Sequence, residues 1–163
     1  MPPIHDADPL LILAIALASK RRAAVLGDVV AAVELLNGAI PAAQKLVDAF
    51  ARLSTAGLVV ADPDGFRLTA AGEAVAAGPV GKADAAARLQ VVRERLGEYR
   101  PAGAHAAVAV DPAAVLSAMS EHLALSAVAK TNALVPKPKP PEAKTRGPGF
   151  RQRKPPPAKR KRH

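Results

Sequence analysis

The sequence has 163 residues, a formal net charge of +9, no cysteine, and hydrophobic residues at 50% of its positions. Without cysteine the chain has no disulfide or thiolate chemistry, and a reducing compartment suits it. The length favours one small domain with appendages.

The positive charge is concentrated from residue 136 onward. Residues 136–163 contain eleven Lys or Arg and one acid, whereas residues 1–135 contain twelve Lys or Arg and thirteen acids. The first of these segments therefore carries +10 and the second −1. The net charge of the whole chain consequently gives no reason to expect a basic surface on the folded part.

The first predicted helix begins with Asp8-Pro9, a capping residue followed by a first-turn proline, and ends at Ala18. It is apolar almost all round, which indicates a buried central helix. It is too short to cross a bilayer, and we expect no membrane partner. The run Ser19-Lys20-Arg21-Arg22 ends this helix. These cations either complement the negative end of the helix or contact phosphate groups.

Two further helices are expected before residue 56. The second covers residues 27–37, ends at Asn37-Gly38, and directs Asp28 and Glu34 toward water. The third follows Pro41, a residue suited to the first helical position. Its apolar stripe consists of Leu46, Phe50 and Leu53.

After the third helix the apolar period changes from that of a helix to that of strands. Gly57 is a natural left-handed stop, and residues 58–60 form a short β-prone run. Turn residues occupy positions 62–65, and residues 66–68 alternate between apolar and polar. This pattern predicts a β-hairpin, after which Thr69 caps a short helix.

Two motifs carry a resemblance to a known family. Residues 53–59 read Leu-Ser-Thr-Ala-Gly-Leu-Val, and residues 68–72 read Leu-Thr-Ala-Ala-Gly. A helix ending in the first motif, then a hairpin, then the second motif resembles the winged-helix fold of prokaryotic transcription regulators, over residues 8–77. The resemblance implies a mainly α fold of three helices and a hairpin wing. It also implies a role in DNA binding, although winged helices serve as protein-binding modules too.

The apolar residues of these elements form the expected core of the small domain. They are Leu13, Leu17, Val33, Leu36, Ile40, Leu46, Phe50, Leu53, Leu58, Val60, Phe66 and Leu68.

Two more helices are expected between residues 79 and 135. One covers residues 82–97, and the other covers residues 113–130. A short strand is expected at residues 108–110. Each helix has one apolar stripe that it cannot bury alone, so it should pack on the first domain or on a partner chain. A homodimer through residues 82–130 is therefore one expectation. The stripes consist of Ala85, Leu89, Val92 and Leu96 in the first helix, and of Leu116, Met119, Leu123 and Ala127 in the second.

The chain thus divides into a winged-helix domain (1–78), a helical extension (79–135) and a tail (136–163). The tail contains eight prolines among its basic residues, and its composition predicts disorder. Its basic residues are candidates for phosphate contacts, for a nuclear import signal in a eukaryote, or for simple solubility. The phosphate-contact candidates are Arg151, Arg153, Lys154, Lys159, Arg160, Lys161 and Arg162.

No catalytic motif, phosphate-binding loop or metal-ligand spacing is found in the sequence, so we expect neither an enzyme nor a cofactor. The candidate base-reading helix is the third one. Off its apolar stripe it offers Ala42, Ala43, Gln44, Lys45, Asp48, Ala49 and Arg52. Gln44 suits adenine, and Lys45 or Arg52 suits guanine or phosphate. In the wing only Arg67 is basic, and Asp62 and Asp64 flank the tip.

Two functions are compatible with these features. The first is a DNA-associated regulator whose winged helix docks on duplex DNA, with weak sequence preference, while the tail adds non-specific affinity. Such a protein would act in the cytoplasm at the nucleoid, or in the nucleus of a eukaryote. The second is a protein-interaction module that does not read DNA.

Overall fold

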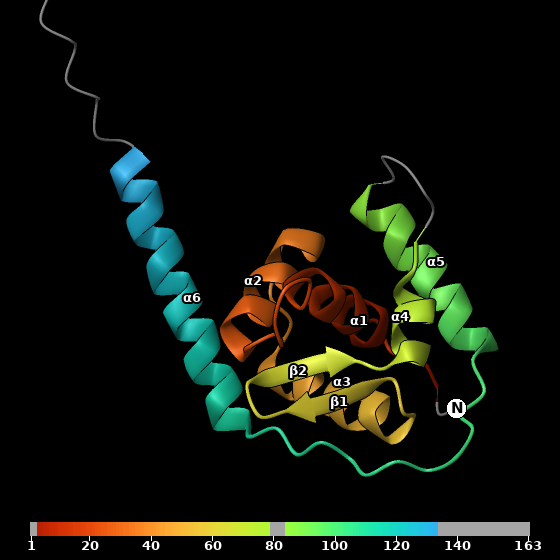
Figure 1. Cartoon of the computed structure of the whole chain (residues 1–163). Helices are drawn as coiled ribbons and strands as arrows, with labels where there is room; N and C mark the ends of the chain where they lie inside the picture. Colours follow the sequence, from red (N-terminus) through yellow and green to blue (C-terminus); the bar gives the residue numbers. More distant parts are fainter. Residues whose placement is uncertain (1–2, 79–83, 134–163) are drawn as a thin grey trace, which may run out of the picture.

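The computed structural model describes residues 3–78 and 84–133, with residues 130–133 described by their backbone alone. The elements in chain order are α1 (Ala7–Ala18), α2 (Leu26–Asn37), α3 (Ala43–Thr55), β1 (Val59–Asp62), β2 (Gly65–Leu68), α4 (Ala70–Ala76), α5 (Ala85–Glu98) and α6 (Pro112–Ala133). The described part is mainly helical, and three helices precede an antiparallel hairpin, as expected (Figure 1). The predicted disorder of residues 136–163 concerns residues outside the described ranges.

Helix α1 is the centre of the body. It packs against α2, α3, α4, α5 and the hairpin strand β2. Leu11, Ile12 and Ile15 are completely buried, which confirms the expectation of a central helix. The predicted start was wrong, because the helix begins at Ala7 and Asp8 lies inside its first turn. The Asp8 carboxylate is used for another contact, described below.

The end of α2 and the start of α3 are both determined by local backbone conformation. Gly38 terminates α2 with a φ of 72°, the left-handed conformation expected there. Helix α3 begins at Ala43, so the placement of Pro41 at its first position was wrong. The intervening Ala42 is not helical (ψ 140°), which leaves Pro41 before the helix. The predicted stripe is confirmed, because all three of its side chains are at most 1% exposed.

The hairpin pairs Val59 with Leu68 and Val60 with Arg67. Val59 and Leu68 are buried, and successive strand residues point to opposite faces, so Val60 faces solvent and is 46% exposed. The assignment of Val60 to the core was therefore wrong, because the neighbouring strand residue Val59 is the one that is buried. Phe66 of β2 packs against Phe50 of α3 with ring centroids 4.6 Å apart, which joins the hairpin to the helix.

The two motifs behind the winged-helix resemblance meet in one hydrogen-bonded junction. The Thr69 hydroxyl donates to the Gly57 carbonyl (2.6 Å) and accepts from the Gly72 N–H (3.2 Å). Gly57 has a φ of 75°, which favours glycine. Gly72 passes so close to the hairpin that a Cβ there would lie 2.2 Å from the Leu58 carbonyl oxygen. Both glycines and the threonine thus have a packing reason for their positions.

The predicted core is largely confirmed. Seven of its twelve residues are buried: Leu13, Val33, Leu46, Phe50, Leu53, Leu58 and Leu68. Four are partly buried: Leu17, Leu36, Ile40 and Phe66. The core list omitted several fully buried side chains of α1 and α2, namely Leu11, Ile12, Ile15, Val29 and Val30.

Helix α5 packs on α1 and buries Val92 and Leu96 completely, in agreement with its predicted stripe. Asp84 caps the helix, because its carboxylate accepts from the Ala87 N–H at 2.8 Å. The strand expected at residues 108–110 is absent from this described segment. The Val108 N–H donates instead to a side chain, as described below.

Helix α6 packs against α2 and α3, but with a different face from the predicted one. Val115 and Ala118 are buried, whereas Leu116 and Leu123 of the predicted stripe are 57% and 52% exposed. The apolar period of the sequence therefore placed the buried face about one position out of register. Met119 is partly buried at the edge shared by both faces.

A polar contact fixes α6 on α2. The His122 ring bonds the Glu34 carboxylate, and both side chains are partly buried. The prediction that Glu34 faces water was therefore only partly right, because its side chain is 36% exposed but also contacts α6. His122 and Glu34 lie 88 positions apart, so no local sequence pattern could predict that they form a pair.

Candidate nucleic-acid interface

The outward face of α3 is narrower than the sequence suggested. Ala43 and Ala49 were expected to be exposed, but they are 9% and 0% exposed and belong to the core. Gln44 and Lys45 are exposed as expected. The Gln44 amide donates to the Asp48 carboxylate at 2.8 Å, so one of its two donors is occupied within the helix.

Arg52 is bound to a buried carboxylate. Its Nη2 and Nε atoms donate to Asp8 Oδ1 at 2.6 and 3.1 Å. The Asp8 side chain is 1% exposed, and its Oδ2 accepts from the His5 backbone N–H at 2.8 Å. Arg52 therefore supplies the countercharge that Asp8 needs in the interior. A contact of Arg52 with DNA would have to compete with this pair.

Two other predicted DNA-contacting arginines also have acidic partners. Arg67 of the hairpin pairs with Asp62 at 3.0 Å, and Arg22 of the α1–α2 loop pairs with Asp28 at 2.9 Å. Both pairs are solvent-exposed, so they contribute little to stability, but they reduce the positive field of their surfaces. Among the basic residues of the predicted body contacts, those without an ion pair in the described residues are Lys20, Arg21 and Lys45.

The segment of residues 99–111 crosses the carboxyl end of α3, and we call it the strap. The Tyr99 hydroxyl donates to the Ala56 carbonyl at 3.0 Å, and the His105 N–H donates to the Thr55 carbonyl at 3.2 Å. The Val108 N–H donates to the hydroxyl of Ser54, a residue only 1% exposed, at 2.8 Å. The strap thus joins α5 to α6 along the end of the candidate base-reading helix.

Replacing Ser54 by alanine is expected to destabilise the protein by about 1–3 kcal/mol, because the Val108 N–H loses its partner in a partly buried place. Urea denaturation followed by circular dichroism measures the loss. Thr55→Ala is the matched control, since the exposed Thr55 hydroxyl donates only to the Ala51 carbonyl of its own helix. An equal loss in both variants would contradict the role of Ser54 in holding the strap.

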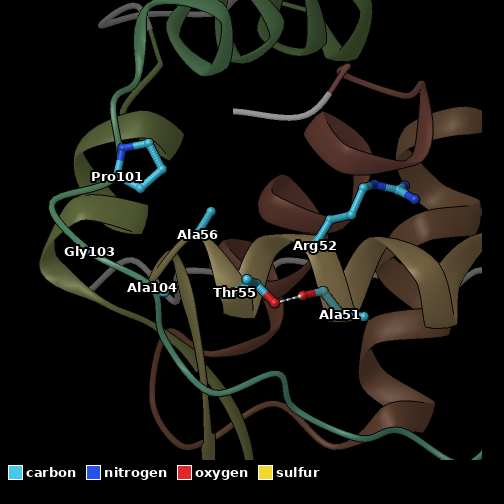
Figure 2. Close-up of a pocket in the computed structure, with 7 residues that line it drawn as sticks. All are labelled: Ala51, Arg52, Thr55, Ala56, Pro101, Gly103 and Ala104. Atoms are coloured by element: carbon cyan, nitrogen blue, oxygen red, sulfur yellow. Dashed lines mark hydrogen bonds between the residues drawn. The ribbon is translucent and has the colours of Figure 1, made fainter.

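An open hollow of about 540 Å³ lies between the strap and α3. It is lined by Ala51, Arg52, Thr55, Ala56, Pro101, Gly103 and Ala104 (Figure 2). The guanidinium of Arg52 points away from the strap, and the Thr55 hydroxyl is bonded to Ala51. The hollow therefore presents carbon surface and no charged group, and it is unsuited to phosphate.

Other chemistry is limited in the described ranges. Within residues 3–78 and 84–133, no group of three or more His, Asp or Glu side chains is arranged to hold a metal ion. In the same part of the chain, residues 112–129 of α6 are long and apolar enough to cross a bilayer by length and composition, although one side of this helix packs on the body. The seven predicted phosphate contacts between residues 151 and 162 lie outside the described residues.

No protein-family model, curated protein or solved structure matches the chain.

Proposed function

We propose that this chain is a winged-helix, DNA-associated protein of the kind that regulates transcription. We further propose that most of its affinity for DNA comes from residues 136–163. The separation of charge carries the proposal: this segment holds +10, whereas residues 1–135 hold −1. Phosphate contacts supply most non-specific affinity for duplex DNA, so the basic segment should dominate binding.

The layout of the body supports the winged-helix assignment, because three helices precede an antiparallel hairpin and α4 follows directly. The side-chain contacts support a secondary role for the body on DNA. Arg52 is committed to Asp8, and Arg67 is paired with Asp62. Base readout by α3 would then rest on Gln44 and Lys45, so we expect a weak sequence preference.

Replacing Arg160, Lys161 and Arg162 by glutamine in the full chain is expected to weaken binding to a mixed-sequence duplex. The slope of log affinity against log salt should become shallower by about 2.7, because each lost phosphate contact removes about 0.9. Fluorescence anisotropy titrations at several salt concentrations measure the slope.

The matched control replaces Lys20, Arg21 and Lys45 by glutamine. These are the basic residues of the predicted body contacts without an ion pair in the described residues. These three substitutions are expected to change the slope by less than about 1. A larger change from the body substitutions than from the tail substitutions would overturn the proposal.

A second candidate function is a protein-interaction module that does not bind DNA. Four exposed large apolar side chains on α6 favour it, because exposed apolar surface gathered on one element is typical of an interaction site. The same titration separates the two candidates. An unmodified chain that shows no affinity for duplex DNA even at low salt would leave the interaction module as the function.

A further inference from the structure

The hairpin has an open backbone edge on the outer side of β1. On the other side of the hairpin, the Phe66 N–H donates to the Ala24 carbonyl at 2.9 Å, and the Phe66 carbonyl accepts from the Ala24 N–H at 2.8 Å. These groups of Phe66 therefore point away from β1. Its partner across the hairpin is Ala61, whose N–H and carbonyl must point away from β2 in the same way. Ala61 is exposed, so this edge offers a donor and an acceptor to a further strand.

The side chains beside this edge indicate what kind of strand would fit. Val60 lies on the solvent face of β1 and is 46% exposed, so it offers apolar surface. The turn of the hairpin carries Asp62 and Asp64, and Asp64 has no ion pair in the described residues. An extended segment with one large apolar residue followed by basic residues would match both features.

A segment of this chain has that composition and repeats the sequence of the strand that already pairs with β1. Residues 65–67 and residues 149–151 both read Gly-Phe-Arg, and two of the three phenylalanines of the chain lie in this tripeptide. In β2 the tripeptide packs a phenylalanine on the core and pairs an arginine with Asp62. The second copy continues with Gln152 and Arg153, and it lies outside the described residues. Its sequence suits the contacts that β2 makes from the other side.

The chain is long enough to return this segment to the hairpin. Helix α6 ends at Ala133, and its carboxyl end points away from the body (Figure 1). The helix has 22 residues, so it is about 33 Å long. Residue 149 follows 16 positions after Ala133, and 16 extended residues span up to about 53 Å. The connection therefore exceeds the length of the helix that it has to retrace.

We propose that residues 149–153 add a strand to the outer edge of β1 in the same chain. The Ala61 N–H and carbonyl bond the backbone of this segment, and Phe150 covers Val60. One of the arginines that follow pairs with Asp64. Backbone bonds to a preformed edge require little apolar area, so a segment whose composition disfavours independent folding is able to dock there.

The docked strand has a consequence for DNA binding, and this consequence rests on the proposed function. Arg151 and Arg153 belong to the predicted phosphate contacts, and the acidic turn occupies them while the segment is docked. DNA then has to displace the segment from β1 before these arginines reach phosphate. The hairpin thus acts as an internal competitor of DNA and lowers the apparent affinity of the chain.

Amide hydrogen exchange of the full chain without DNA tests the docked strand. Because the Ala61 N–H points away from β2, the added strand is expected to protect it. Phe150→Ala should speed the exchange of this amide at least about fivefold. Thr145→Ala is the matched control, because it lies in the same basic segment but outside residues 149–153, and it should leave the rate unchanged. Amide NMR spectra check that the hairpin is intact in each variant.

Three results would overturn the proposal. The first is exchange of the Ala61 amide in the unmodified chain at the rate of an unprotected peptide. The second is equal exchange in the unmodified chain and in Phe150→Ala. The third is protection that disappears on dilution, which would assign the added strand to another copy of the chain.

A titration with duplex DNA separates this inference from the proposed function. Phe150→Ala keeps every basic residue, and it is expected to bind a mixed-sequence duplex about twofold to fivefold more tightly, because no docked segment competes. An affinity no higher than that of the unmodified chain would overturn the role of the hairpin as a competitor. A chain that protects Ala61 but has no affinity for DNA would refute the proposed function and support the docked strand.

Discussion

Arg52→Ala is expected to destabilise the protein by about 3–5 kcal/mol, because it leaves the Asp8 carboxylate charged and buried without its partner. The Asp8 side chain is 1% exposed, and apart from Arg52 its carboxylate accepts a hydrogen bond from the His5 backbone N–H. Few interactions in the body combine such deep burial with a full charge. Urea denaturation of the full chain, monitored by circular dichroism, measures the change.

A double-mutant cycle separates the pair from the loss of packing. Asp8→Ala with Arg52→Ala is expected to be less destabilising than the sum of the single substitutions, because the double variant leaves no unpaired charge. Arg22→Ala provides the surface control and should cost less than about 1 kcal/mol, because the Arg22–Asp28 pair is exposed. An Arg52→Ala variant as stable as the Arg22→Ala variant would contradict the structural role of Arg52.

The same substitution bears on DNA binding. If Arg52 mainly holds Asp8, its removal should lower stability without changing the preference among duplexes, provided that binding is measured where the variant is folded. A changed sequence preference in the folded variant would instead place Arg52 at the bases.

Gly72→Ala is expected to cost about 3 kcal/mol or more, because the new Cβ would meet backbone that cannot move aside. The Cβ would lie 2.2 Å from the Leu58 carbonyl oxygen, and that oxygen also accepts the Thr69 N–H at 3.0 Å. The substitution therefore forces α4 away from the hairpin. Thermal unfolding of the full chain reports the loss as a lower melting temperature.

Gly97→Ala is the control for the general effect of replacing a helical glycine. It lies in α5, where the nearest atom to a new Cβ is Ile4 Cδ1 at 3.8 Å, an ordinary contact. Higher helix propensity should stabilise this variant by up to about 1 kcal/mol. A Gly72→Ala variant that melts no lower than the wild type would show that the α4–hairpin junction is looser than described.

The elements that local chemistry determines were predictable from the sequence. Gly38 and Gly57 stop helices through their left-handed conformation, and Thr69 caps α4 with its own hydroxyl. The stripe of α3 was equally clear, because its apolar residues recur at strict helical spacing. The hairpin was found through its turn residues, although its inward face was assigned one residue too far along at Val60.

Two of the contacts that were missed join residues far apart in sequence. Asp8 and Arg52 are 44 positions apart, and His122 and Glu34 are 88 positions apart. The buried side of α6 depends on where α2 and α3 place their surfaces, so the period of its own sequence selected a neighbouring face. In the candidate site, the exposure of Gln44 and Lys45 was foreseen, but the acidic partners of the arginines were not.

Whether the basic segment dominates DNA binding is tested most directly by titrating the isotopically labelled full chain with a short mixed-sequence duplex and following its amide NMR signals. If residues 136–163 dominate DNA binding, the largest changes should fall on residues 151–162, with small changes at Gln44 and Lys45. Larger changes along α3 and the hairpin than in the basic segment would contradict it, and would show that the body itself holds the DNA.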